Sequence, residues 1–254
     1  MKATIIKIGG VFAENDELVS NLAAELLEFL NEGRGPILLV HGGGSTISEV
    51  ENRWGYEAAF VDGLRETSVE TMPLVDMALA GAVNKRLVRL LRRGNLNAWG
   101  LSGVDGGLIL AKSVRGSRTG RVASLDSKPL RMLWGNGYLP VLAPPASDEE
   151  GRGLNVNADE AALALALKYN AQNLVFISDI PGVLSDDKLI RRLDSLAAEK
   201  KIASGEVWGG MIPKIKSAID ALRGGVGAVF IGDYLGYGDL GKLLLHQKGT
   251  TIGG

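Results

Sequence analysis

The chain has 254 residues, 46% of them hydrophobic and 22% charged, which is enough to bury one large core or two smaller ones. A formal net charge of -1 argues against a nucleic-acid partner, and the absence of cysteine excludes disulfides and cysteine metal sites. The apolar runs are too short to span a bilayer, and the first residues lack the apolar core of a signal peptide, so we expect a cytoplasmic protein with no membrane partner.

Short apolar segments of β-rich composition recur along the chain, and helix-patterned stretches separate most of them. They cover residues 4–8, 36–40, 98–101, 139–142, 173–178 and 228–231. This alternation predicts an α/β protein with a mainly parallel open sheet sandwiched by helices.

The first predicted helix covers residues 14–31. Leu18, Leu22 and Leu26 fall on one helical face, and Glu25 falls on the opposite, polar face. This pattern predicts a helix that lies on the sheet through its leucines.

A glycine run, Gly42 to Gly44, follows the second predicted strand. Thr46 and Glu49 have the spacing of a capping box, which would start a helix directly after the glycine turn. Glycines let backbone N–H groups approach an anion, and helix N-termini attract negative charge. The coincidence of strand, glycine turn and helix N-terminus therefore favours a phosphate site.

Residues 108–130 break the alternation with short β-like pieces around residues 115–120. We interpret them as a hairpin or lid outside the main sheet and assign them no catalytic role. The chain has no long linker and no repeat, so we place the boundary between two lobes near Asn170, just before the fifth predicted strand.

Several familiar site motifs are absent. Gly44 is followed by Ser45 without the lysine of a Walker A loop, and Phe230 stands where a dinucleotide fingerprint requires a small residue. The histidines, His41 and His246, lie far apart in the sequence, which argues against a histidine metal site or a Ser-His triad. We interpret His41 as structural.

Lys7 stands beside Gly9 and Gly10 at the end of the first predicted strand. Alone, it could be a solvated lysine at the end of an edge strand. Ligands of open parallel sheets, however, bind outside the carboxyl ends of the strands, where this turn and the turn at Gly42 to Gly44 both fall. Together the two turns predict one cradle for phosphate.

Two further segments are ambiguous when taken singly. Asn157 could simply be the N-cap of the helix that follows it, and Pro213 could simply lie in the first turn of the helix after Gly209 and Gly210. The second segment, however, adds Lys214, a full positive charge beside a glycine pair. In combination these features predict phosphoryl transfer.

The ordered set of motifs resembles the amino acid kinase family and, within it, the acetylglutamate kinases of arginine biosynthesis. The matching motifs span nearly the full length. They lie at residues 7–10, 41–44, 63–65, 84–85, 100–107, 137–141, 155–159, 178–183, 209–214 and 249–250.

The resemblance implies ATP-dependent phosphorylation of the side-chain carboxylate of N-acetyl-L-glutamate, which gives N-acetyl-L-glutamyl 5-phosphate. Such a carboxylate, with a pKa of about 4.3, is ionised at pH 7 and attacks without a general base. The difficulty is repulsion between an anionic nucleophile and an anionic donor, so catalysis consists of positioning and charge neutralisation.

The resemblance also implies a role for each matching residue. Lys7 and Lys214 would contact the transferring phosphoryl group while Asp159 holds both ammonium groups. The amino-acid substrate would be bound by Gly43, Gly44, Arg65, Asn155 and Asn157. The nucleotide would be bound by Gly9, Gly10, Asp179, Ile180, Pro181, Gly182, Val183, Leu184, Gly209 and Gly210.

These roles assign residues 1–170 to an amino-acid-substrate and dimerisation lobe and residues 171–254 to a nucleotide-binding lobe. Mg²⁺ is expected with ATP, bridging its phosphates, and no protein carboxylate is assigned as its ligand.

The chain departs from the resemblance at Glu66, where most acetylglutamate kinases have valine. Residues 83–85 and 140–145 are also similar to the sister kinases of carrier-protein-dependent lysine biosynthesis. A carrier-linked aminoadipate or glutamate kinase is therefore the alternative, and a non-catalytic binding paralogue is another. Retention of both lysines and Asp159 argues against the paralogue.

Two further expectations concern partners. Lys7 begins so close to Met1 that no room is left for the N-terminal helix of arginine-inhibited hexamers, so we expect a homodimer. Arg115, Arg118 and Arg121 could meet an acidic carrier protein, although a solvated basic loop is the simpler interpretation.

Overall fold

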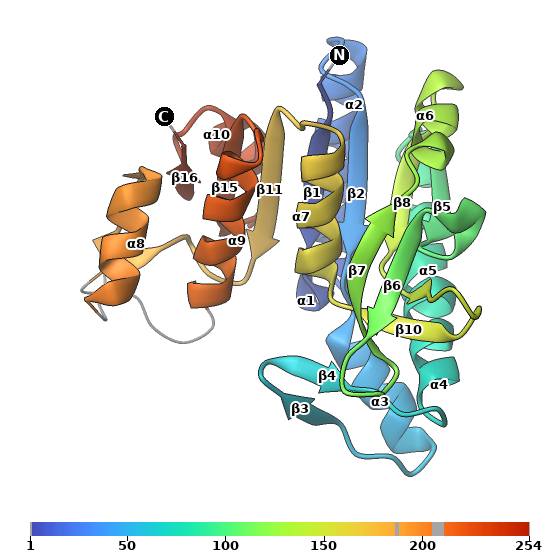
Figure 1. Cartoon of the computed structure of the whole chain (residues 1–254). Helices are drawn as coiled ribbons and strands as arrows, with labels where there is room; N and C mark the ends of the chain where they lie inside the picture. Colours follow the sequence, from blue (N-terminus) through green and yellow to red (C-terminus); the bar gives the residue numbers. More distant parts are fainter. Residues whose placement is uncertain (1, 186–187, 205–210, 254) are drawn as a thin grey trace.

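The computed structural model describes residues 2–185, 188–204 and 211–253. Its centre is an eight-stranded sheet with the strand order β14-β16-β15-β11-β1-β2-β8-β5 (Figure 1). In chain order these strands are β1 (Thr4–Ile8), β2 (Ile37–His41), β5 (Ala98–Ser102), β8 (Leu139–Ala143), β11 (Asn173–Ser178), β14 (Arg192–Leu193), β15 (Ala228–Asp233) and β16 (Thr250–Ile252).

The six predicted strands are all present in the main sheet. β15, β11, β1, β2, β8 and β5 pair in parallel, and among the described pairings of this sheet the one between β15 and β16 is antiparallel. The prediction of a mainly parallel sheet is therefore confirmed. Parallel order brings the carboxyl ends of β1, β2, β11 and β15 to one edge.

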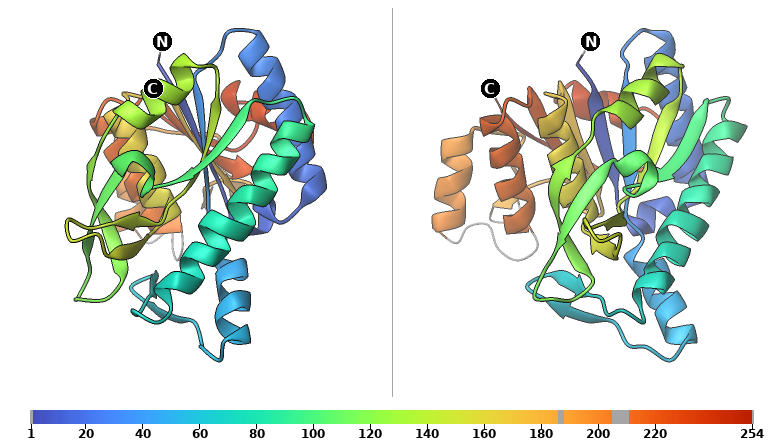
Figure 2. Two further views of the ribbon diagram at one scale, coloured as in Figure 1. Left: turned by 90° about the vertical axis from the view of Figure 1, so that its right-hand side faces the viewer. Right: turned by 45° about the vertical axis from the view of Figure 1, so that its right-hand side comes forward.

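Helices cover both faces of the sheet (Figures 1 and 2). The helices are α1 (Gly10–Ala13), α2 (Asp16–Asn31), α3 (Gly44–Arg53), α4 (Met72–Asp76), the π-helix η1 (Met77–Val83), α5 (Asn84–Arg93), the 3₁₀ turn η2 (Asp105–Gly107), α6 (Lys128–Gly135), α7 (Ala158–Lys168), α8 (Ser195–Ala203), α9 (Met211–Arg223) and α10 (Asp239–Leu244).

Each face of the main sheet has its own hydrophobic core and its own layer of helices, because successive residues of a strand point to opposite faces. Ile5 of β1 packs in the core that contains α6, α7 and α9, and Ile6 packs in the core that contains α2, α5 and α10. The helix sandwich predicted from the sequence is therefore confirmed.

The remaining strands stand outside the main sheet. The segment predicted as a hairpin forms β6 (Ile109–Ser113) and β7 (Thr119–Leu125), which close into a small barrel with β9 (Ala146–Ser147) and β10 (Gly153–Val156). A second hairpin joins β3 (Ala59–Val61) to β4 (Leu64–Glu66), and β12 (Leu184–Ser185) pairs antiparallel with β13 (Lys188–Leu189).

The first predicted helix differs from the structure in two ways. It begins at Asp16, two residues later than predicted, because Asn15 is the N-cap of α2 and accepts hydrogen bonds from the backbone of Glu17 and Leu18. The assignment of Glu25 to a solvated face is wrong: it is 3% exposed and accepts a bond of 2.6 Å from the Tyr234 hydroxyl. The helical pattern could not reveal this partner, which lies 209 residues away in sequence.

The predicted capping box is also wrong. α3 begins at Gly44, three residues earlier than the box requires, with Gly43 as an N-cap that makes no side-chain bond. The Thr46 hydroxyl instead donates to the Glu14 carboxylate at 2.9 Å. The glycine turn thus runs directly into the helix.

Asn170, the predicted lobe boundary, lies between α7 and β11 with a positive φ of 44°. β11 pairs with β1 from Thr4 to Ile8, so one sheet runs through both predicted lobes. No helix in the described part of the chain is long and apolar enough to cross a membrane.

Candidate active site

Two glycine turns meet at the carboxyl edge of the sheet. β1 ends at Ile8 and β2 at His41, which are register partners, so Gly10 and Gly43 follow neighbouring strand ends. A Cβ placed on Gly10 would lie 3.2 Å from the Cα of Gly43 and 3.3 Å from the backbone nitrogen of Gly44. The two turns therefore touch, and the single phosphate cradle expected from the sequence has a physical basis.

Lys7, Asp159 and Lys214 come together although they are distant in sequence. Lys7 Nζ lies 2.7 Å from Asp159 Oδ1, and Lys214 Nζ donates to Asp159 Oδ2 at 2.8 Å. Lys7 comes from β1, Asp159 from the first turn of α7 and Lys214 from the first turns of α9. One carboxylate is thus shared by two ammonium groups.

Local structure fixes Asp159. The Asn157 side chain caps α7 by accepting from the backbone N–H groups of Asp159 and Glu160, so the capping interpretation of Asn157 is confirmed. Burial opposes ionisation of Asp159, but the attraction of Lys7 and Lys214 outweighs it and holds the pKa of that carboxyl below its usual value. Asp159 is therefore a carboxylate at neutral pH.

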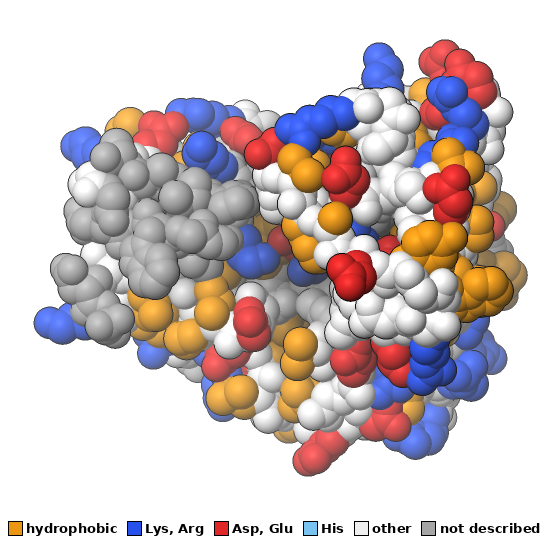
Figure 3. All heavy atoms as spheres, turned by 90° about the horizontal axis from the view of Figure 1, so that it is seen from below, with side chains coloured by type: hydrophobic (Ala, Val, Ile, Leu, Met, Phe, Trp, Pro, Cys, Tyr) orange, Lys and Arg blue, Asp and Glu red, His pale blue; other side chains and the backbone are white. Residues whose placement is uncertain are grey.

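Lys7, Asp159 and the two glycine turns border a cavity of about 390 Å³. Figure 3 shows the hollow from below, with basic side chains at its floor. Its wall contains eight residues to which the sequence assigns a role: Lys7, Gly10, Gly43, Gly44, Arg65, Asn155, Asn157 and Asp159. The volume is in the usual range for a small-molecule site.

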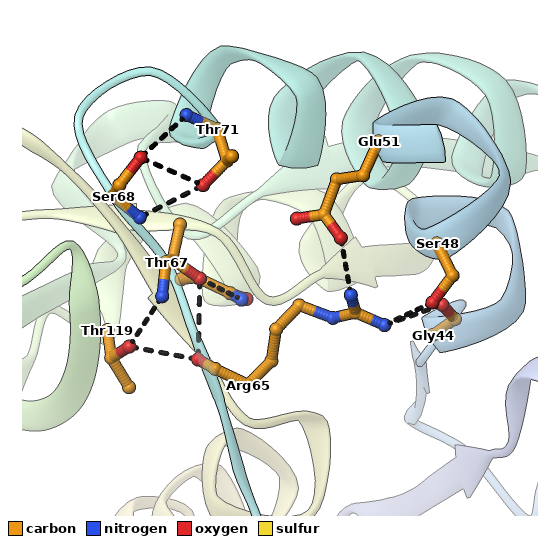
Figure 4. A network of polar contacts seen from close by, with 9 residues as sticks. Gly44, Ser48, Glu51, Arg65, Thr67, Ser68, Thr71 and Thr119 are labelled. Atoms are coloured by element: carbon orange, nitrogen blue, oxygen red, sulfur yellow. Dashed lines mark hydrogen bonds and ion pairs between the residues drawn. The ribbon is translucent and has the colours of Figure 1, made fainter. Parts of the chain in front are cut away.

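Arg65 reaches the cavity from β4 and is tied to α3 (Figure 4). Its Nη1 donates to Glu51 at 2.5 Å, and its Nη2 donates to the Gly44 carbonyl and the Ser48 hydroxyl, each at 2.8 Å. A guanidinium so fixed presents a planar donor group to the cavity.

Asn155 belongs to a chain of polar contacts around the backbone of Arg65. Its side-chain amide donates to Thr67 Oγ1 at 2.9 Å, and the Thr119 hydroxyl donates to the Arg65 carbonyl at 2.9 Å (Figure 4). Thr67 N–H donates in turn to Thr119 Oγ1 at 3.1 Å. This network fastens β4 to β7.

Several residues of the cavity wall had no role assigned from the sequence, among them Ser48, Phe60 and Thr119. Ser48 lies one turn into α3, and Thr119 lies in the hairpin that we had given no catalytic role. None carries a motif by itself, because each reaches the cavity only through tertiary packing.

The segment expected to hold the nucleotide follows β11 at the same edge of the sheet. Ser178, the last residue of β11, pairs with Asp233 of β15, and Asp179 follows it. Thr250 secures the segment, because its buried hydroxyl accepts from the Val183 backbone at 2.8 Å and donates to the Ile190 carbonyl at 2.5 Å. Gly9 caps α1, and the predicted nucleotide residues Gly209 and Gly210 lie outside the described residues.

His41 is part of the scaffold. It is fully buried, with Nδ1 2.9 Å from the Gly42 carbonyl and Nε2 3.1 Å from the Asn84 side-chain amide. Burial lowers the pKa of His41 to about 4, although the bond to Gly42 favours the charged form. The neutral ring thus donates to Gly42 and accepts from Asn84.

The basic hairpin is partly neutralised. Arg115 forms an ion pair with Asp62 at 2.5 Å, and Arg121 lies 3.5 Å from a Glu160 carboxylate oxygen.

Among the described residues no group of three or more histidine or acidic side chains is placed to hold a metal ion.

Comparisons with known proteins agree with this arrangement. The model of the amino acid kinase family matches residues 2–233. An acetylglutamate kinase from Geobacillus kaustophilus is 38% identical over 255 residues, which cover 99% of this chain and 95% of the relative.

Solved structures share the fold. A crystal structure of a protein from Streptococcus mutans superposes with a TM-score of 0.85 and 29% identity, covering 99% of this chain and 98% of the other. A carbamate kinase from Giardia superposes with a TM-score of 0.74 and 16% identity, with 99% and 98% of the two chains covered. The likeness therefore extends over nearly the whole molecule.

Proposed function

The chain belongs to the amino acid kinase family, and on that premise we propose that it is an acetylglutamate kinase. It transfers the γ-phosphoryl group of ATP to the side-chain carboxylate of N-acetyl-L-glutamate, which gives N-acetyl-L-glutamyl 5-phosphate and ADP, the second step of arginine biosynthesis. The observation that carries this proposal is the Lys7–Asp159–Lys214 cluster beside two touching glycine turns.

The chemistry needs neutralisation more than proton transfer. The acceptor carboxylate is already ionised at neutral pH, so an oxygen lone pair attacks the γ-phosphorus and the bond to the β-phosphate oxygen breaks. Negative charge spreads over the transferring oxygens. Lys7 and Lys214 offset that charge, and Asp159 keeps the two ammonium groups together.

The glycine turns supply donors without side chains. We assign the backbone N–H groups of Gly9, Gly10 and Gly43 to the phosphates. A side chain on Gly10 would separate the two turns. ATP would enter as its magnesium complex, and the ion would add positive charge where negative charge develops on the phosphoryl group. Asp159, engaged by two lysines at 2.7 and 2.8 Å, is left to orient those lysines and not to bind the cation.

The acceptor lies in the cavity with its reactive end toward the lysines. Arg65 binds its α-carboxylate, because a guanidinium forms charge-assisted hydrogen bonds with a carboxylate. Gly44 and Asn155 complete the wall. The Asn157 carbonyl oxygen is used in capping α7, so its NH₂ group is the part available to the acetyl group.

The nucleotide lies over the strand ends beyond Lys7. We assign the segment from Asp179 to Leu184 to nucleotide binding, and we also assign Gly209 and Gly210, which lie outside the described residues. In this arrangement residues 1–170 bind the amino acid and residues 171–254 bind the nucleotide. The anchoring of Val183 by Thr250 supports a fixed position for the segment.

We further propose a homodimer in the cytoplasm, where ATP is available. β5 is an edge strand of the sheet, and Trp99 on it is 47% exposed beside the Tyr138 ring. An edge with an exposed aromatic side chain suits pairing with a second copy. Light scattering that gives the mass of one chain would refute the dimer.

Hydroxylamine trapping tests the proposed reaction, because it converts an acyl phosphate into a stable hydroxamate. The protein is incubated with MgATP and, separately, N-acetylglutamate, glutamate, N-acetylaspartate and N-acetylaminoadipate. We expect hydroxamate from N-acetylglutamate alone. Product from the longer homologue, or from none of the four, would contradict the assignment.

A further inference from the structure

A buried acidic residue stands behind the proposed acceptor site. Glu51 of α3 is 2% exposed and forms an ion pair of 2.5 Å with Arg65, whose side chain is 7% exposed. The described cavity wall includes Arg65 but not Glu51. Glu51 therefore contacts the guanidinium from the side that faces away from the cavity.

This contact fixes the guanidinium in one orientation. Glu51 holds Nη1, while Nη2 reaches the Gly44 carbonyl and the Ser48 hydroxyl at the cavity wall (Figure 4). The Phe60 ring lies 4.9 Å from the guanidinium carbon and limits rotation out of this plane. The arginine is thus preorganised before any ligand arrives.

The orientation of Arg65 also determines what Ser48 can do. A hydroxyl has one proton to donate and lone pairs to accept. Because Ser48 Oγ accepts from Arg65 Nη2, its proton remains available for an acceptor in the cavity. Nη2 uses its two N–H groups on Gly44 and Ser48, so Arg65 contributes a donor from Nε or Nη1. That donor and the Ser48 hydroxyl together match the two oxygens of a carboxylate.

Glu51 also has an electrostatic effect, which opposes binding of the acceptor. As an anion it repels a carboxylate bound on the other side of Arg65, and it neutralises the charge of the guanidinium. If charge alone decided affinity, removing Glu51 would strengthen binding of the acceptor. If positioning decides it, removal weakens binding, because a loosened guanidinium loses entropy when it is ordered again.

We propose that Ser48 and Arg65 together bind the α-carboxylate of the acceptor, and that Glu51 is the positioning residue that holds both donors in place. The inference rests on the proposed function and deepens it. It adds a binding residue, Ser48, and a positioning residue outside the cavity.

The test compares Glu51→Gln and Ser48→Ala with the wild type, using N-acetylglutamate and its α-amide as acceptors. Glu49→Gln is the matched control, because Glu49 lies on the same helix but is exposed and paired with Arg53. The rates of hydroxamate formation give kcat and KM for each acceptor and for ATP. Thermal melting monitored by circular dichroism reports folding.

We expect KM for N-acetylglutamate to rise about tenfold in each variant, which is the effect of losing one charge-assisted hydrogen bond, with kcat and KM for ATP within about twofold. For the α-amide, which lacks the second anionic oxygen, the rise should be about threefold or less. Glu49→Gln should match the wild type. A purely structural role of Glu51 would lower the melting temperature without this difference between acceptors.

An unchanged or lower KM for N-acetylglutamate in folded Glu51→Gln would overturn the positioning role. If Glu51→Gln does not fold, Ser48→Ala decides, because it removes only a hydroxyl from a half-buried helical position. An unchanged KM in Ser48→Ala would overturn the paired donors. A wild-type protein that does not phosphorylate N-acetylglutamate would refute the proposed function itself, and this inference with it.

Discussion

Replacement of Asp159 by asparagine tests whether two lysines act as one unit. The change preserves the shape of the side chain but removes the charge that lies 2.7 Å from Lys7 and 2.8 Å from Lys214. Two ammonium groups held roughly 5 Å apart repel each other by about 3 kcal/mol at an effective dielectric constant of about 20. Without the carboxylate, the lysines should separate and leave the transferring phosphoryl group.

That repulsion sets the size of the expected effect. If most of this repulsion energy raises the transition state, kcat/KM should fall roughly a hundredfold, since about 1.4 kcal/mol corresponds to a factor of ten. Hydroxamate formation at saturating MgATP measures the loss. Glu160→Gln is the control, because Glu160 follows Asp159 on α7 but bonds the Val122 backbone outside the cavity wall. Wild-type activity in Asp159→Asn would refute the reasoning.

The same variant gives a prediction about stability and pH. The folded pKa of Asp159 lies below its unfolded value, so its ion pairs stabilise the fold above the unfolded pKa and are lost as pH falls through the folded pKa. The difference in unfolding free energy between wild type and Asp159→Asn should therefore be largest near pH 7 and shrink below pH 4. A difference that grows on acidification, measured by urea unfolding, would contradict the proposed charge state.

Three further changes probe the scaffold. Because burial lowers the pKa of His41 to about 4, the unfolding free energy should fall by about 3 kcal/mol as pH decreases from 6.5 to 4. Urea unfolding of His41→Asn should lack this pH dependence. An equal pH dependence in both proteins would contradict the neutral, buried His41. Gly10→Ala should reduce kcat/KM in the hydroxamate assay about tenfold, because its Cβ would force the two glycine turns apart. The control Gly135→Ala, whose Cβ meets open space, should match the wild type. Equal activity of the two variants would contradict the phosphate cradle. Thr250→Val leaves the Val183 N–H without its partner, so KM for ATP should rise severalfold while KM for N-acetylglutamate stays constant; equal increases in both would show a general loss of structure.

The fold was largely predictable because its strands are continuous apolar runs. In a parallel sheet covered on both faces, burial demands such runs, and residues 4–8 and 173–178 show them clearly. The carboxyl-edge location of Gly10 and Gly43 then follows from strand order alone. Prediction failed where a local pattern met a distant partner: Glu25 looked solvated, but the Tyr234 hydroxyl allows its burial.

The candidate site was predictable only in part. Lys7, Asp159 and Lys214 are each ambiguous alone, and their spatial meeting depends on α7 packing against β1 and α9 packing against α7. Thr46 failed as a helix cap because Glu14, on another element, attracts its hydroxyl. Ser48 and Glu51 carry no local signal, because their importance arises from Arg65, which arrives from a separate hairpin.

The central claim is that a carboxylate oxygen of the acceptor attacks the γ-phosphorus in this cavity. Isotope transfer tests it most directly: N-acetylglutamate labelled with ¹⁸O in its side-chain carboxylate is incubated with MgATP, and the acyl phosphate is cleaved with hydroxylamine. Hydroxylamine attacks the carbonyl carbon, so the bridging oxygen leaves with phosphate. The account predicts one ¹⁸O in each phosphate released with hydroxamate, and no label transfer in Lys214→Ala. Unlabelled phosphate from the wild type would mean that water is the nucleophile, and would contradict the account.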